Sequence, residues 1–279
     1  MTVAGFVSIT RPANAVVSGV AALVGYLVAT GTLVPQAFVL VPVVALITAA
    51  GNVINDYFDA EIDAVNRPGR PIPSGAVHRS AAWVYAALLF LAGLFLSFFT
   101  TPLCVAIALF NSALLVAYAA KLKGIPIAGN IAVSYLSASI FLFGGALVGT
   151  EGVYADLPLF VITFFAMLAR ELLKDAEYVE GDTLGGARTL PMITGIRSTS
   201  RLALASAAVA AAASVLPFFK WGYPYLAGIA IVDVVIIAAA ARALACTTPA
   251  CVKESKATSM LKAGFFASLI VFTLSAVLL

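Results

Sequence analysis

The sequence has few charged residues, few cysteines and a single histidine. Charged residues make up only 10% of its 279 residues, whereas 62% are hydrophobic and the mean hydropathy is +1.07. Soluble globular proteins average about 25% charged residues and about 45–50% apolar ones. So few charges cannot cover the surface of a water-soluble domain of this length, and they exclude a disordered chain and a nucleic-acid-binding protein. The composition therefore predicts a protein that crosses a membrane several times.

The three cysteines do not suggest a disulfide scaffold. Cys104 falls within an apolar run, and Cys246 and Cys251 fall in a loop that the topology below places in the cytoplasm. Because that compartment is reducing and the pair lacks the spacing of zinc ligands, we expect unpaired thiols. His78 lies in a polar loop, where we expect a solvated side chain rather than a metal ligand.

Long uncharged stretches divide the chain into helices. The 44 residues between Arg11 and Asp56 carry no charge, and neither do the 41 between Arg79 and Lys121. A membrane helix needs about 20 apolar residues, so each stretch holds two helices and a tight turn. Membrane β-strands would appear as segments of about ten residues in which polar and apolar side chains alternate. The runs in this sequence are longer and do not alternate. Five further runs raise the predicted number of helices to nine: 126–149, 155–175, 200–218, 223–243 and 260–279.

The cations predict the orientation of the protein. With nine helices, 15 of the 16 Lys and Arg residues lie on the side of the N-terminus, Lys220 being the exception. The positive-inside rule places that side in the cytoplasm and the C-terminus outside the cell membrane. The net charge of +3 suits contact with anionic headgroups or phosphorylated substrates rather than with nucleic acid.

Nine of the 13 acidic residues fall into two short segments, 56–63 and 171–182. In and beside the first segment, Asn55, Asp59 and Asp63 are spaced i, i+4, i+8. A helix that continues through them carries the three side chains in one stripe.

The second segment closes another predicted helix and forms a similar stripe, provided that the helix persists through Gly181. Both segments end even-numbered helices, which run in the same direction, and each is followed by a loop rich in Arg, Pro and Gly, at 67–75 and 185–191. This weak repeat predicts two parallel four-helix halves and a last helix, with a site at the junction of the halves. The second stripe consists of Glu171, Asp175, Tyr178 and Asp182.

The two stripes indicate a divalent cation, because carboxylates at this spacing repel one another unless a positive charge lies between them. Magnesium takes oxygen ligands and is typically held by one or two carboxylates together with substrate phosphates. Flanking Lys and Arg suit the remaining phosphate oxygens. The pattern predicts a Mg²⁺–diphosphate site whose cationic residues are Arg67, Arg70, Lys121, Lys123 and Lys174.

A simpler interpretation is that charged residues at helix ends only mark the membrane interface. Nine acids in two one-sided clusters favour a functional site over that interpretation. Asp233 lies instead in the middle of the apolar run at 223–243. A functional role and a structural hydrogen bond explain an acid there equally well, so Asp233 is left out of the site.

These motifs resemble those of the UbiA superfamily of intramembrane prenyltransferases, and the resemblance covers essentially the whole chain. Residues 55–63, with the tail Asn66-Arg67-Pro68-Gly69-Arg70-Pro71-Ile72-Pro73-Ser74-Gly75, resemble the first signature of the family, and residues 170–182 and 189–191 resemble the second. Two shorter segments are similar to the N-terminus and the Tyr/Lys segment of the family: Arg11-Pro12 with Asn14, and Tyr118 with Lys121 and Lys123.

The resemblance implies one transmembrane prenyltransferase domain over residues 1–279 that ionises an allylic diphosphate and transfers its prenyl group to a lipophilic acceptor in the membrane. The form of the second motif is most similar to archaeal enzymes that add a geranylgeranyl chain to geranylgeranylglyceryl phosphate in ether-lipid synthesis. An aromatic or tetrapyrrole acceptor, of the quinone or chlorophyll type, is the alternative. A cation-coupled transporter is the alternative from another class. No nucleic acid and no obligatory protein partner is expected.

The resemblance also implies roles for individual residues. The metal ligands are Asn55, Asp59, Asp63, Asp175 and Asp182, and the four carboxylates among them are catalytic together with Tyr118, whose ring could stabilise an allylic cation. Further candidate substrate contacts are Asn14, Tyr178 and Arg188. The chain departs from the family at Tyr178, where the second signature carries Asp. Asp175, one turn earlier, could supply that carboxylate, and the sequence leaves the choice open.

Overall fold

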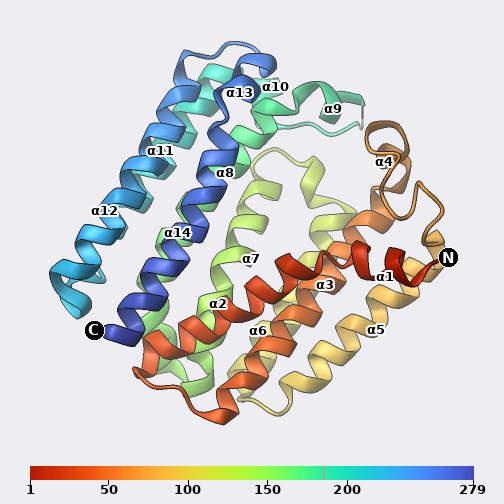
Figure 1. Ribbon diagram of the computed structural model, residues 1–279. Coiled ribbons are helices and arrows are strands. Elements are labelled where there is room, and N and C mark those ends of the chain that lie inside the picture. The colour runs from red at the N-terminus through yellow and green to blue at the C-terminus, as the bar shows by residue number, and fades with distance from the viewer. Residues whose placement is uncertain (185) are drawn as a thin grey trace. The chain divides into compact units, whose positions relative to one another are not determined.

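The computed structural model describes residues 1–184 and 186–279, and every regular element in them is a helix (Figure 1). Gly185, which belongs to the second predicted polar loop, lies outside the described residues. Nine of the described helices have at least 18 residues: α2 (Pro12–Thr30), α3 (Leu40–Phe58), α5 (Arg79–Ser97), α6 (Pro102–Ala120), α7 (Ala128–Gly145), α8 (Thr150–Glu177), α11 (Ile196–Ala213), α12 (Phe218–Arg242) and α14 (Ala257–Leu278).

Short helices connect or precede the long ones. The α-helical ones are α1 (Val3–Ile9), α4 (Ala60–Asn66), α9 (Val179–Leu184), α10 (Leu190–Thr194) and α13 (Pro249–Ser255). Four short 3₁₀ helices are η1 (Pro35–Val39), η2 (Leu122–Gly124), η3 (Ala146–Val148) and η4 (Ala243–Ala245).

Eight helical segments of the described chain are long and apolar enough to cross a membrane, which confirms the all-α, multi-spanning fold class. Among the long helices, α11 is not one of the eight. Its first turns contain Arg197, Arg201 and several hydroxyl residues, and most of its remaining residues are alanine. Nine spans and two four-helix halves therefore stay predictions.

The helices form two compact units. Unit 1 consists of Met1–Leu122 and Ile140–Ala155, and unit 2 consists of Lys123–Ser139 and Asp156–Leu279. The chain passes from one unit to the other three times, within η2, within α7 and within α8. The first acidic stripe belongs to unit 1 and the second to unit 2.

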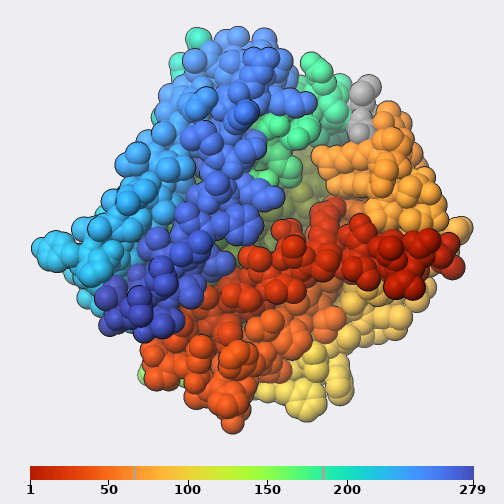
Figure 2. All heavy atoms as spheres, viewed as in Figure 1, coloured from red at the N-terminus to blue at the C-terminus, as the bar shows by residue number. Residues whose placement is uncertain are grey.

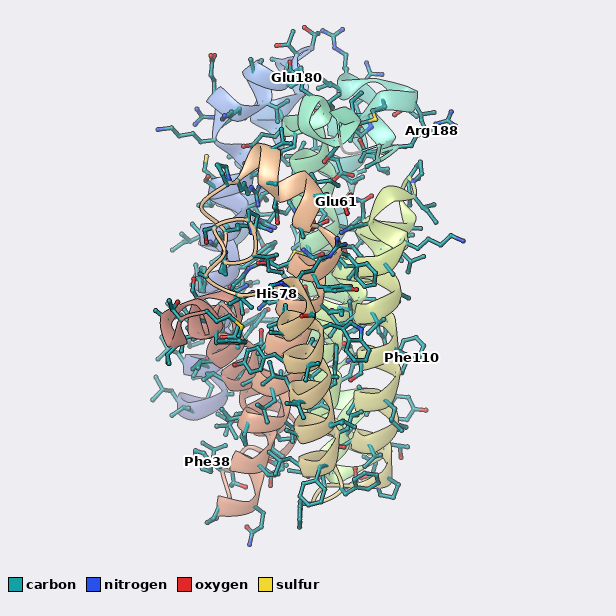
Figure 3. All side chains as sticks on the ribbon, turned by 90° about the vertical axis from the view of Figure 1, so that its right-hand side faces the viewer. Phe38, Glu61, His78, Phe110, Glu180 and Arg188 are labelled. Atoms are coloured by element: carbon teal, nitrogen blue, oxygen red, sulfur yellow. A yellow bond between two sulfur atoms is a disulfide. The ribbon has the colours of Figure 1, made fainter. Side chains whose placement is uncertain are left out.

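In unit 1, α3 packs against α2, α5 and α6 (Figure 1). Small residues allow the close approach, as is common between membrane helices. A Cβ atom on Gly19 of α2 would lie 2.6 Å from the carbonyl oxygen of Val41 in α3, so only glycine fits there. Glu61 on α4 and Phe38 on η1 lie towards opposite ends of the unit (Figure 3). The acidic stripe is thus built at the end of unit 1 that carries α4.

In unit 2, α12 packs against α11 and α14. α12 and α14 lie side by side along one face of the unit (Figure 2). The outward face of α14 exposes Phe266, Ile270, Leu274 and Val277, whereas Gly264, Ser268 and Phe272 are buried. Apolar side chains outside and mostly small ones inside are the arrangement expected of a helix surrounded by lipid.

One prediction about the cysteines is wrong. Cys246 and Cys251 form a disulfide, with their Cα atoms 5.4 Å apart. The turn between η4 and α13 brings them together, and the argument for free thiols depended on the compartment rather than on distance. Cys104 is a free, buried thiol, as expected.

Candidate active site

The helix continues through the first predicted stripe. α3 ends at Phe58 and α4 begins at Ala60, but Asp59 between them has helical φ and ψ angles of −83° and 0°. The amide of Asp59 donates to the carbonyl of Asn55 at 2.9 Å, and that of Asp63 to the carbonyl of Asp59 at 2.8 Å. Because the i to i+4 pattern is unbroken, the three side chains share one face of the helix. Their role as metal ligands stays a prediction.

Neighbouring groups hold the oxygens of this stripe in place. Asn55 Nδ2 donates to Asp59 Oδ2 at 2.8 Å. Arg70 Nη1 donates to Asp63 Oδ2 at 2.6 Å, and the Asp63 side chain is 8% exposed. The turns after α4 therefore return Arg70, a predicted diphosphate ligand, to the acidic stripe.

Another carboxylate, that of Asp56, lies beside the stripe and was not predicted as a site residue. Asp56 is buried, and its Oδ1 accepts hydrogen bonds from Arg11 Nη2 at 2.5 Å and from Arg70 Nη1 at 3.1 Å. Arg11 also donates to Asn52 Oδ1 at 3.2 Å. Arg11 therefore joins the start of α2 to the end of α3. The stretch Asn52–Asp63 carries a polar residue every three or four positions, a signal that could have identified Asn52 and Asp56 as partners.

The remaining predicted residues of unit 1 lie elsewhere on its polar surface. Arg67 is exposed at the end of α4, Asn14 is exposed on α2, and Lys121 is exposed just after α6. Tyr118 is half-buried near the end of α6. Among the hydrogen bonds and ion pairs of the described residues, none joins Asn14, Arg67 or Lys121 to the stripe, which leaves their cationic or amide groups available to a ligand.

The second stripe also follows an unbroken helical path. α8 ends at Glu177 and α9 begins at Val179, and the amides of Tyr178 and Asp182 donate to the carbonyls of Lys174 and Tyr178 at 3.0 and 2.9 Å. The helix thus persists through Gly181, as the predicted stripe required.

Polar partners surround the second stripe as well. Asn130 Nδ2 on α7 donates to Asp175 Oδ2 at 2.8 Å. Glu171 is buried between two cations: it accepts from Arg170 Nη1 at 2.6 Å and from Lys174 Nζ at 3.0 Å. Lys174, a predicted diphosphate ligand, is therefore also an ion-pair partner of Glu171. Sequence reasoning missed Asn130, whose only signal is an amide at the start of an apolar run.

Asp182 and Tyr178 differ in their surroundings. Asp182 is half-buried, and this burial raises the pKa of its carboxyl group above the usual value, partly opposed by the positive charge of Lys174. Tyr178 is exposed. Asp175, the candidate for the missing family carboxylate, is half-buried and accepts the hydrogen bond from Asn130.

The loop after α9 carries the last predicted residues. The amide of Arg188 donates to the carbonyl of Gly124 at 3.2 Å, which ties this loop to η2, where Lys123 lies. Lys123 is half-buried, and the side chain of Arg188 is exposed (Figure 3). Two predicted cations of unit 2 are therefore carried by segments that contact each other.

The donor sets fit a hard cation such as Mg²⁺. In the described part of the chain no three His, Cys, Asp or Glu side chains form a ready-made metal site. Mg²⁺ does not need one, because it keeps several waters and is completed by substrate phosphates. The first stripe offers two carboxylates and the amide oxygen of Asn55. The second offers Asp175 and Asp182, besides Glu171, which is paired with Arg170 and Lys174.

Comparison with known proteins agrees with this arrangement. The model of the UbiA prenyltransferase family matches residues 18–273. The chain belongs to the UbiA prenyltransferase family. It is therefore an intramembrane prenyltransferase, as the motifs predicted, and its family membership removes the support for a transporter.

Named relatives and solved structures match over nearly the whole chain. A digeranylgeranylglyceryl phosphate synthase of Methanoregula boonei is 61% identical over 279 residues, which cover 100% of both chains. The solved structure of a digeranylgeranylglyceryl phosphate synthase is similar with a TM-score of 0.83 at 33% identity, over 99% of this chain and 98% of that one. A UbiA homologue of Archaeoglobus fulgidus, bound to GPP and Mg²⁺, shares the fold with a TM-score of 0.62 at 16% identity, over 95% and 99%.

Proposed function

We propose that this member of the UbiA family transfers a geranylgeranyl group from its diphosphate to geranylgeranylglyceryl phosphate in archaeal ether-lipid synthesis. The observation that carries the proposal is the 61% identity to the Methanoregula boonei synthase over the full length of both chains. Identity at that level across the motifs, loops and helices supports the same acceptor as well as the same donor chemistry. The partners are then a prenyl diphosphate, a phosphorylated lipid acceptor and the surrounding membrane.

Magnesium is the proposed cofactor. Binding of GPP with Mg²⁺ by the Archaeoglobus fulgidus homologue supports this choice, as do the oxygen donors of both stripes. A bound Mg²⁺ would supply Lewis-acid stabilisation of the negative charge on the leaving diphosphate. The proposed ligands are Asn55, Asp59 and Asp63 in unit 1, and Asp175 and Asp182 in unit 2.

The protein's own residues orient these ligands and bind the substrate. Asn55 fixes Asp59 Oδ2 by its 2.8 Å hydrogen bond, and Arg70 holds Asp63 in the same way at 2.6 Å. Cationic side chains that the fold already holds in position stabilise the leaving diphosphate, because they do not have to rearrange during the reaction. The proposed diphosphate ligands are Arg67, Arg70, Lys121, Lys123 and Lys174, and the further substrate contacts are Asn14, Tyr118, Tyr178 and Arg188.

The proposed orientation follows from the cations. The positive-inside rule places the N-terminus and the acidic stripes on the cytoplasmic side of the cell membrane. A cysteine introduced beside exposed Lys121 and labelled from either side of sealed vesicles tests this orientation. Labelling from the outer side of right-side-out vesicles would contradict it.

The function is tested with purified protein, Mg²⁺, geranylgeranyl diphosphate and geranylgeranylglyceryl phosphate. We expect a Mg²⁺-dependent ether product. Parallel reactions with glycerol phosphate, an aromatic acid and chlorophyllide measure the acceptor preference. Faster transfer to the aromatic acid or to chlorophyllide would overturn the proposed acceptor while leaving prenyl transfer intact, whereas no transfer to any acceptor would overturn the activity itself.

A further inference from the structure

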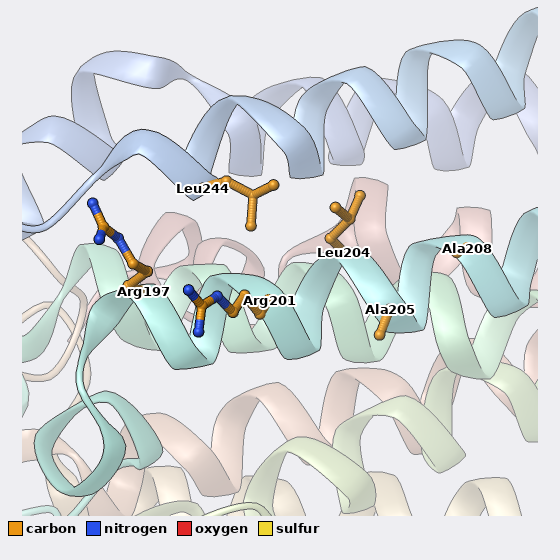
Figure 4. Close-up of a pocket in the computed structure, with 6 residues that line it drawn as sticks. All are labelled: Arg197, Arg201, Leu204, Ala205, Ala208 and Leu244. Atoms are coloured by element: carbon orange, nitrogen blue, oxygen red, sulfur yellow. The ribbon is translucent and has the colours of Figure 1, made fainter.

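A groove of about 470 Å³ lies on unit 2 between α11 and η4, and none of the residues assigned to the candidate active site lines it. Figure 4 shows its walls: five residues of α11, and one residue that faces them from η4 at the end of α12. The lining consists of Arg197, Arg201, Leu204, Ala205, Ala208 and Leu244.

The groove is charged at one end and apolar along the rest. The lining residues of α11 are spaced i, i+4, i+7, i+8 and i+11 from Arg197, so they share one face of the helix. This face extends for about 16 Å along the helix axis, at about 1.5 Å per residue. The two arginines occupy its first turns, and beyond them Ala205 and Ala208 have side chains too small to fill the space against Leu244. The shape matches an anionic head followed by a hydrocarbon chain.

The two arginines have no acidic partner in the part of the chain that the structure describes. Arg11, Arg70, Arg79 and Arg170 each form an ion pair with a carboxylate. Within the described residues, neither Arg197 nor Arg201 does so, and both are exposed. Like charges one helical turn apart repel, so an anion between them would relieve the repulsion.

The position along the chain places this charged end at a membrane boundary. The candidate span Phe218–Ala245 ends beside Leu244, so the arginines are next to the end of a membrane-spanning segment. Lipid phosphates lie at that depth, and basic pockets between membrane helices bind anionic headgroups. A soluble anion would gain nothing from the apolar wall of Leu204, Ala205 and Leu244.

We infer that this groove binds an anionic phospholipid of the surrounding membrane. The phosphate accepts hydrogen bonds from the guanidinium groups of Arg197 and Arg201, which can bind it bidentately. One hydrocarbon chain lies along Leu204, Ala205, Ala208 and Leu244. The bound hydrocarbon chain makes apolar contacts with the alanine-rich surface of α11, whose own side chains are too short to fill the groove.

A simpler explanation is that both arginines only extend to the membrane surface without binding a particular lipid. Native mass spectrometry of the detergent-solubilised protein distinguishes specific lipid binding from this simpler explanation. The probes are diether phosphatidylglycerol and diether phosphatidylcholine with the same chains. We expect the wild type to retain the anionic lipid preferentially. The double variant Arg197→Gln/Arg201→Gln should retain about tenfold less, because charge-assisted hydrogen bonds are lost.

The matched control is Arg242→Gln/Lys253→Gln, which removes the same charge from two exposed cations of unit 2 that do not line the groove. It should retain lipid as the wild type does. Equal losses in both double variants would show non-specific attraction and overturn the inference. Retention of both lipids to the same extent by the wild type would overturn it as well.

A third variant tests the apolar part without changing charge. Ala208 is exposed, so Ala208→Leu fills the groove without disturbing the helix core. We expect it to lower retention of the anionic lipid several-fold while Arg197 and Arg201 remain. Unchanged retention, or full displacement of the lipid by soluble glycerol phosphate, would reduce the site to an anion site and contradict the proposed lipid. This variant also decides the matter if the double arginine variant does not fold.

Discussion

Arg70 Nη1 lies 2.6 Å from Asp63 Oδ2 and 3.1 Å from Asp56 Oδ1, so one guanidinium bridges two buried carboxylates at the end of α3 and in α4. Removing one partner of a buried ion pair leaves the other charge without compensation. We expect Arg70→Ala to lower the free energy of unfolding by about 3 kcal/mol. Thermal unfolding in detergent measures this loss.

The exposed pair in the same unit provides the control for Arg70→Ala. Arg79 donates to Glu61 at 3.0 Å, and the Glu61 side chain is 85% exposed. Glu61→Gln should therefore change stability by less than about 1 kcal/mol. If the two variants are equally stable, the bridge formed by Arg70 does not stabilise the fold, and its role is confined to substrate binding.

The hydrogen bond from Asn55 to Asp59 predicts a specific effect on metal affinity. In Asn55→Ala the orientation of Asp59 is lost together with one oxygen donor. Losses of such supporting groups cost about 10–100-fold in metal affinity. We expect the Mg²⁺ concentration for half-maximal prenyl transfer to rise by that factor, with activity recovered at high Mg²⁺. A loss of activity that no Mg²⁺ concentration restores would contradict this role.

Asp59→Ala removes a proposed ligand itself and should lower activity by more than Asn55→Ala does, at least about 100-fold. Glu61→Ala, two residues further along on α4, is the matched control because this exposed carboxylate is not on the stripe. Its activity should equal that of the wild type. Similar activity in Asp59→Ala and Glu61→Ala would exclude Asp59 as a metal ligand.

The raised pKa of Asp182 predicts how Mg²⁺ binding depends on pH. A carboxylate must lose its proton to bind a metal, so Mg²⁺ affinity falls as pH falls through that pKa. Because burial raises the pKa of Asp182, this fall begins at a higher pH than for an exposed aspartate. In Asp182→Asn the Mg²⁺ affinity should be weaker and this part of the pH dependence absent. An unchanged pH profile in the variant would show that Asp182 is not a ligand.

Helix periodicity accounts for what could be predicted of the site. Spacing placed Asn55, Asp59 and Asp63 on one face because hydrogen bonding continues through Asp59. The side chains that form hydrogen bonds with the acidic site residues could not be predicted from spacing. Arg11 reaches Asp56 across 45 positions of sequence, and Asn130 reaches Asp175 across 45 as well. Such pairs depend on how helices pack, which periodicity does not reveal.

The same limit explains one difference in the fold and one prediction that stays open. Hydropathy located the long helices, since each uncharged run corresponds to one or two of them. It could not locate the disulfide of Cys246 and Cys251, which depends on the turn between η4 and α13. It also predicted a span where α11 lies, a helix whose alanines and arginines make it less apolar than the eight candidate spans.

Asp233, which the sequence left between a functional and a structural role, has a local partner. Ser214 Oγ donates to Asp233 Oδ2 at 2.6 Å, and Tyr225 OH donates to the backbone carbonyl of Ser214 at 2.8 Å. These contacts connect the turn after α11 to α12 and favour the structural role. Ser214→Ala leaves the carboxyl group without this partner and should lower the free energy of unfolding by about 1–3 kcal/mol. Asp233→Asn keeps an oxygen acceptor and should cost less, and both variants should retain prenyl transfer once folded. Loss of transfer in folded Asp233→Asn, with thermal unfolding unchanged, would assign Asp233 to function instead.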